Sequence, residues 1–82
     1  MRHARDSDLD RVEALLVQLR TLPGLIEKQR GVFYRRSRSF LHFHEDPKGL
    51  FADISDPDER INVTEPQGRA ALMAAARRRL NL

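Results

Sequence analysis

The chain has 82 residues and no cysteine. A chain of this length forms one domain, so residues 1–82 are expected to share a single core. The lack of cysteine excludes disulfides, thiolate catalysis and cysteine-ligated metal centres. The formal net charge of +3, from 15 basic and 12 acidic side chains, does not by itself predict nucleic-acid binding, because phosphate is bound by locally clustered charge.

The N-terminal segment is charged where a signal peptide would be apolar. The apolar runs of the chain are also far shorter than the ~20 residues that a membrane-spanning helix needs. We therefore expect a cytoplasmic protein that does not associate with membranes.

The first predicted element is an amphipathic helix that begins near Ser7 and is stopped by Pro23 and Gly24. Its apolar residues recur every three or four positions, as they do on one face of a helix. These residues are Leu9, Val12, Leu16 and Leu19. Residues 25–27 are compatible with either a short strand or an extended connector.

From Gly31 the period of the apolar residues changes to two. The segments "GVFYRR", "SFLHFHE" and "GLFADIS" are rich in aromatic and branched side chains, and "RSR" and "DPKG" between them are short enough for hairpin turns. "INV" is expected to add a short edge strand. The pattern predicts an antiparallel meander.

A second helix is expected from Thr64, with Thr64 and Gln67 at capping-box spacing and Pro66 in the first turn. Its apolar stripe consists of Leu72, Met73, Ala76 and Leu80. The predicted fold class is α+β: an N-terminal helix, an antiparallel meander of three to five strands and a C-terminal helix, with both helices on one face of the sheet.

The turn types predict the register of the sheet. A type I turn at "DPKG" and a two-residue loop in the preceding hairpin define the facing residues. The predicted pairs are Glu45 with Leu50, Phe43 with Ala52, His42 with Asp53, Leu41 with Ile54, Val32 with Leu41, and Phe33 with Phe40. Since side chains alternate along a strand, one face would then carry Val32, Tyr34, Leu41, Phe43, Ala52 and Ile54, and the second would carry Phe33, Phe40, His42, His44, Phe51 and Asp53.

The polar residues of the second face have two interpretations, a metal site and a structural cross-strand pair. His42, His44 and Asp53 could supply three ligands. However, two histidines two apart occur often by chance, no third histidine is expected nearby, and His3 is expected in a mobile terminus. The simpler interpretation is a cross-strand pair of His42 with Asp53. We therefore predict no metal and no cofactor.

The mixture of aromatic, histidine and carboxylate side chains on this second face predicts an interaction surface. The leading expectation is a non-enzymatic bacterial module that forms a homodimer or binds an unknown protein partner. The runner-up is nucleic-acid binding, with bases stacked on the phenylalanines and phosphate bound by Arg35, Arg36 and Arg38. A ligand pocket lined by Tyr34 and an enzyme remain open, although no nucleophile motif or phosphate loop is present.

The C-terminal arginines, Arg77 to Arg79, have two interpretations. Cations in the last turn of a helix are favoured by its dipole. Alternatively, they form a basic surface for an anionic partner.

Residues 31–54, "GVFYRRSRSFLHFHEDPKGLFADI", resemble a segment of small uncharacterised bacterial proteins of about this size. That resemblance implies no activity and no catalytic residue. The order of predicted elements is also similar to that of the small YjbR-like α+β proteins, some of which are described as possible DNA binders.

Overall fold

The structure is a computed structural model that describes residues 2–82. Within these residues the chain forms an α+β fold with an antiparallel meander, as predicted. The helices are α1 (Asp6–Asp10), α2 (Glu13–Arg20) and α3 (Pro66–Arg79). The strands are β1 (Arg2–His3), β2 (Ile26–Gln29), β3 (Val32–Arg35), β4 (Arg38–Asp46), β5 (Gly49–Ile54) and β6 (Glu59–Asn62).

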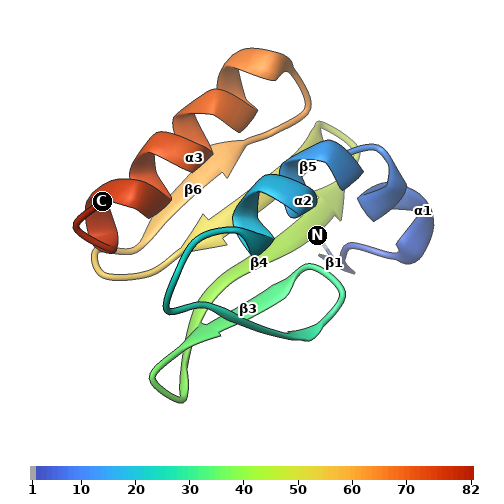
Figure 1. Cartoon of the computed structure of the whole chain (residues 1–82). Helices are drawn as coiled ribbons and strands as arrows, with labels where there is room; N and C mark the ends of the chain where they lie inside the picture. The colour runs from blue at the N-terminus through green and yellow to red at the C-terminus, as the bar shows by residue number, and fades with distance from the viewer. Residues whose placement is uncertain (1) are drawn as a thin grey trace.

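The sheet is organised around β4. The strand order is β2-β3-β4-β5-β6, all antiparallel, and the short β1 also pairs with β4. β4 has nine residues and is long enough for two partners on one edge: β3 pairs with its first half and β1 with its second half. β1 thereby lies beside the middle strand of the sheet (Figure 1).

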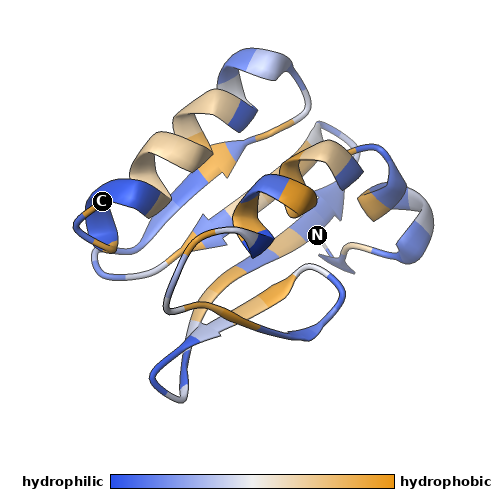
Figure 2. Ribbon diagram, viewed as in Figure 1, coloured by the Kyte–Doolittle hydropathy of each residue, from blue (hydrophilic) through white to orange (hydrophobic). Residues whose placement is uncertain are grey.

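The helices cover one face of the sheet, with α2 and α3 side by side (Figure 1). Apolar segments of the helices and strands meet in this layer, whereas the tip of the β3–β4 hairpin is hydrophilic (Figure 2). Fully buried side chains of the core include Leu16, Leu19, Leu41, Leu50, Ile54 and Leu72. No helix in residues 2–82 is long and apolar enough to cross a membrane.

The predicted N-terminal helix consists of two helices. The backbone of Val12 leaves the helical region, with φ −120° and ψ 23°, so that α1 and α2 run in different directions. Leu9, which precedes the break, and Val12, which forms it, are both buried. Packing of both side chains against the sheet therefore overrides the continuous helical period.

The C-terminal helix begins at Pro66, with Glu65 as its N-cap and without the predicted capping box. The hydroxyl of Thr64 instead accepts a hydrogen bond from the backbone N–H of Leu50, at 3.0 Å. Thr64 thus joins the start of α3 to β5 rather than capping the helix.

The register between β4 and β5 is the one predicted, including His42 opposite Asp53 and Phe43 opposite Ala52. The hairpin between β3 and β4 also has the predicted two-residue loop, because Arg35 pairs with Arg38. Beyond that loop the pairing shifts by one residue.

A β-bulge at Phe40 causes this shift. Phe33 pairs with Leu41 rather than with Phe40, so that the extra residue Phe40 is accommodated in β4. Phe33 and Phe40 are only 1% and 2% exposed and belong to the core. Their predicted place on the second face is wrong, and alternation moves Val32 and Tyr34 to that face instead.

Phe40 and Phe51 provide a direct test of this assignment. We expect Phe40→Leu to lower the free energy of unfolding by about 1–2 kcal/mol, since it shortens a fully buried side chain. The matched control Phe51→Leu alters a half-buried side chain and should cost less than about 1 kcal/mol. Urea unfolding measures both values, and equal losses would contradict the burial of Phe40.

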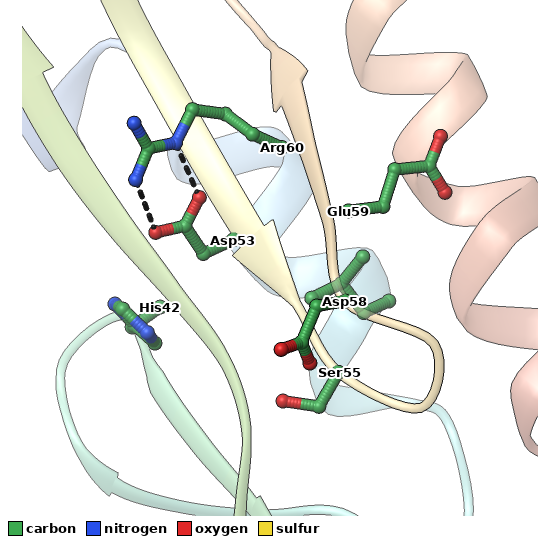
Figure 3. A pocket seen from close by; sticks show the side chains of 7 residues that line it. His42, Asp53, Ser55, Asp58, Glu59 and Arg60 are labelled. Carbon is green, nitrogen blue, oxygen red and sulfur yellow. Dashed lines mark hydrogen bonds and ion pairs between the residues drawn. The ribbon is translucent and has the colours of Figure 1, made fainter.

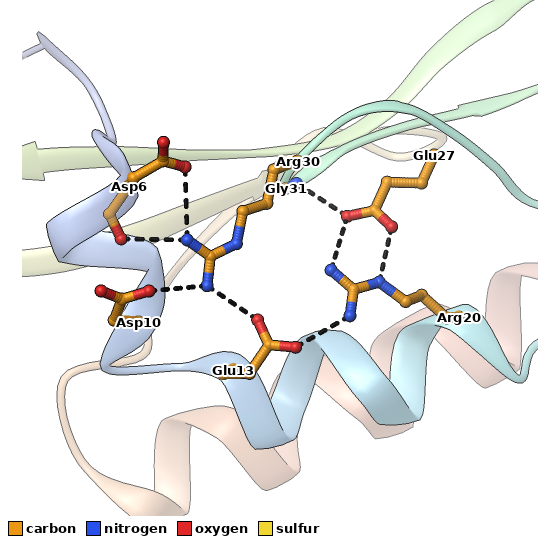
Figure 4. A network of polar contacts seen from close by, with 7 residues as sticks. All are labelled: Asp6, Asp10, Glu13, Arg20, Glu27, Arg30 and Gly31. Carbon is orange, nitrogen blue, oxygen red and sulfur yellow. Dashed lines mark hydrogen bonds and ion pairs between the residues drawn. The ribbon is translucent and has the colours of Figure 1, made fainter.

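An ion network joins the N-terminal helices to the β2–β3 turn (Figure 4). Arg30 contacts Glu13 at 2.8 Å, and Arg20 bridges Glu13 at 2.9 Å and Glu27 at 2.6 Å. Glu27 also accepts a hydrogen bond from the backbone N–H of Gly31. The hydrogen bond from Arg30 lowers the pKa of Glu13, and the hydrogen bond from Arg20 lowers the pKa of Glu27.

The lowered pKa values predict how stability depends on pH. A carboxyl whose pKa is lower in the folded state than in the unfolded state stabilises the fold above its unfolded pKa. This contribution disappears as the pH falls through the folded pKa. We expect Arg20→Gln to reduce stability at neutral pH and to differ progressively less from the wild type below about pH 4.5.

Urea unfolding at a series of pH values measures this effect. Arg11→Gln is the matched control, because Arg11 is an exposed arginine of the same segment that lies outside this network. A stability difference for Arg20→Gln that does not change with pH would contradict the predicted linkage.

Candidate functional site

The candidate site is the face of the sheet that the helices leave uncovered, which we call the open face. Alternation of side chains along the paired strands defines its members. They include His3 from β1, Ile26 and Gln29 from β2, Val32 and Tyr34 from β3, Ser39, His42 and His44 from β4, Phe51 and Asp53 from β5, and Arg60 and Asn62 from β6. Lys28, at the irregularity in β2, lies over the ring of Tyr34. The predicted site residues His42, His44, Phe51 and Asp53 are therefore together on one face.

The centre of the open face contains a histidine cluster, formed by His3, His42 and His44. The rings of His42 and His44 are 4.7 Å apart between centroids, and His3 stacks on His44 at 5.3 Å. One ring nitrogen from each residue can be chosen so that all three lie within 4.8 Å of one another. The open face thus concentrates every histidine of the chain.

The position of His3 corrects the prediction that no third histidine is nearby. His3 pairs with His44 in the β1–β4 ladder. Two contacts on either side of it fix β1: Arg2 forms an ion pair with Glu45 at 2.7 Å, and the N–H of Ala4 donates to the carbonyl of Phe43 at 3.1 Å. No local sequence signal identifies a two-residue strand, so the sequence alone does not place His3 beside His44.

Asp53 lies beside the histidine cluster and contacts one of its members. It lies opposite His42 in register, as predicted, but its carboxylate contacts His44 rather than His42, with Oδ2 2.8 Å from Nε2. Arg60 donates two hydrogen bonds to the same carboxylate, at 2.7 and 3.0 Å (Figure 3). The predicted cross-strand pair is thus a three-residue arrangement of His44, Asp53 and Arg60.

The charges of the site follow from these contacts. The hydrogen bonds from Arg60 lower the pKa of Asp53, so this carboxyl is ionised at neutral pH. Burial lowers the pKa of His42, and its neighbour His44 lowers it further. His42 is therefore a neutral imidazole at neutral pH, with one ring nitrogen free of a proton.

Two ring nitrogens of the cluster are buried without a hydrogen bond. They are Nδ1 of His42 and Nε2 of His44, and neither has a hydrogen-bond partner in residues 2–82. Although Nε2 of His44 is close to Asp53, the two groups are not aligned for a hydrogen bond. Buried polar atoms are normally paired, so Nδ1 of His42 is a candidate for contact with a ligand, whereas Nε2 of His44 already lies beside the Asp53 carboxylate.

A hollow of about 450 Å³ opens beside the cluster (Figure 3). Its wall runs from His42 across Asp53 and Arg60 to Ser55 and Asp58 in the β5–β6 turn. The hollow therefore gives solvent access to one side of His42. Its lining carries side chains of both signs of charge.

The three arginines predicted to bind phosphate, Arg35, Arg36 and Arg38, differ in their surroundings. Arg36 and Arg38 are exposed at the tip of the hairpin, whereas Arg35 donates a hydrogen bond to the carbonyl of Arg79 at the end of α3, at 2.9 Å. Asp56 lines the same small hollow as the three arginines. Its negative charge partly offsets their field.

The C-terminal arginines also differ from one another. Arg79 has a side chain that is only 6% exposed and donates hydrogen bonds to the carbonyls of Ser55 and Pro57, at 2.8 and 2.6 Å. It attaches the β5–β6 turn to α3, which neither interpretation of the sequence included. Arg77 and Arg78 are exposed.

Comparisons of the chain with protein-family models, with curated proteins and with solved structures give no match. The resemblances of residues 31–54 and of the element order stay predictions. The candidate site is accordingly defined by its geometry alone.

Proposed function

We propose that this chain is a bacterial cytoplasmic interaction module without enzymatic activity, and that its open face binds a second copy of the chain. One observation carries the proposal: every helix in residues 2–82 lies on the other side of the sheet, so the open face has no covering layer. A sheet with one apolar face buried normally presents polar side chains on its other face. The open face departs from this pattern.

The composition of the open face supports association. Its middle carries Val32, Phe51 and the imidazoles of His42 and His44, all half-buried. The cationic groups lie on the outer strands, where Lys28 sits 4.3 Å from the ring of Tyr34 and Arg60 neutralises Asp53, which lies beside His44. An apolar and aromatic centre with a polar rim is the usual composition of a protein–protein interface.

The size of the chain supports a second copy as the occupant. Small domains bury a smaller fraction of their surface than large ones and gain stability from a partner subunit. A face on which charges of both signs are interspersed does not repel its own copy. Ile26, which is 62% exposed at the side of the open face, would also gain from being covered.

The alternative of nucleic-acid binding loses part of its support. Phe33 and Phe40, two of the three aromatic rings expected to stack on bases, are buried in the core. The open face is also not basic, because Asp53 offsets Arg60. Phosphate binding depends on a local excess of positive charge, and the open face has little.

A charge placed on the open face tests the proposal. We expect the wild-type chain to sediment as a dimer, and Phe51→Glu to weaken the dimer about tenfold or more, since a carboxylate would be desolvated at the centre of the interface. Sedimentation equilibrium over a range of chain concentrations measures the change.

The matched control is Val17→Glu. Val17 is 51% exposed on α2, on the other side of the molecule, and receives the same charge. Its dimerisation should equal that of the wild type. A wild-type monomer at every concentration, or equal effects of the two variants, would refute association through the open face. Binding of a labelled oligonucleotide by such a monomer would favour the alternative.

A further inference from the structure

The strongest unexplained feature of the molecule is the histidine cluster. Its three members come from two strands that are distant in the sequence but paired in the sheet. His42 and His44 project from the same strand to the same face, and His3 reaches them because it lies directly opposite His44. The chain contains no other histidine, so this convergence accounts for all of them.

We propose that His3, His42 and His44 form a site for one divalent transition-metal ion, with Asp53 as the residue that positions His44. This inference goes beyond the proposed association and does not depend on it, since all the ligands belong to one chain. No part of it requires the open face to be covered.

The spacing of the nitrogens suits such an ion. A metal with bonds of about 2.0–2.1 Å to imidazole, arranged as a tetrahedron, holds its nitrogens about 3.3 Å apart. The three nitrogens of the cluster already lie within 4.8 Å of one another. Binding would require side-chain rotations that bring these nitrogens closer, while the β1–β4 pairing keeps His3 directly opposite His44.

The buried ring nitrogen of His42 gives independent support. A cluster with only a structural role would be expected to satisfy its buried polar atoms. Instead, Nδ1 of His42 is buried and lacks a hydrogen bond in the described part of the chain. Nε2 of His44 faces Asp53 at 2.8 Å, so Nδ1 is the nitrogen of His44 that would bind the ion. Three imidazoles packed this closely would also repel one another when protonated, whereas neutral imidazoles are the form that binds metals.

The surroundings of Asp53 suit a positioning residue. Metal-bound histidines commonly interact with a carboxylate that orients the ring. Asp53 lies 2.8 Å from His44 and is itself held by two hydrogen bonds from Arg60. Because Arg60 already occupies both of its oxygens, Asp53 is better placed to orient His44 than to bind the ion.

The donor set identifies the class of metal. Imidazole nitrogens favour zinc, copper, nickel and cobalt, whereas magnesium and calcium prefer oxygen ligands. Three protein ligands leave a coordination position for water. The hollow that opens beside His42 would connect this position to solvent.

Zinc titration of the full, untagged chain tests the site. After treatment with a chelator, isothermal calorimetry with zinc chloride should show one ion per chain, and calcium chloride should show no binding. Histidine NMR signals should shift until one equivalent is reached. The variant His42→Ala/His44→Ala should lose zinc binding, and His3→Ala, which alters only the end of the sheet, should weaken it at least tenfold.

The remaining variants distinguish the orienting of His44 by Asp53 from a general effect of a nearby negative charge. Asp53→Asn should weaken zinc binding about 10–100-fold, as expected for a residue that orients a ligand. Asp58→Asn is the matched control, because it removes a carboxylate that lines the same hollow but lies outside the cluster. It should bind zinc as the wild type does. Circular dichroism of each variant verifies the fold.

Three results would overturn the inference. They are no zinc uptake by the wild type, zinc binding that persists in the folded His42→Ala/His44→Ala variant, and one zinc ion per two chains. Sedimentation in the presence and absence of zinc reports association separately. A monomer that binds one zinc ion would refute the proposed dimer and support the metal site.

Discussion

The structure depends on the alternation of side chains along β4 beyond the bulge, from Leu41 to His44. This strand pairs with β5 on one edge and with β3 and then β1 on the other, so that its two sides belong to two different environments. Leu41 and Phe43 point into the core, and His42 and His44 point to the open face. A shift of one residue would exchange these environments, because the period of a strand is two. The register of β4 therefore determines both the core and the site.

The bulge at Phe40 reconciles two requirements of this strand. The hairpin loop at Arg36 and Ser37 requires one pairing near the turn, whereas the β5 pairing requires His42 and His44 to face away from the core. One extra residue in β4 satisfies both, and it places Phe33 and Phe40 beneath the helices. The small core gains two large aromatic side chains by this means, and their burial is a major part of its apolar content.

The same geometry relates the two proposals to each other. Since the helices and the largest apolar side chains are used on one face, the open face retains half-buried aromatic and imidazole groups without a cover. Asp53 and Arg60 keep a fixed charge pair beside neutral His42. Association would use the apolar area of this face, and metal binding would use its nitrogens. The two depend on different properties and can be present separately or together.

The sequence by itself determined the elements that depend on local pattern and turn chemistry. These include the C-terminal helix, the meander, the β4–β5 register with His42 opposite Asp53, and the grouping of His42, His44, Phe51 and Asp53. Only the tertiary structure decided the bulge, the break at Val12, the structural role of Arg79 and the addition of His3 to the cluster. Each of these arises from contacts between residues that are distant in the chain. No period or turn signal within a short segment encodes such contacts, because their free energy is realised only when the layers pack.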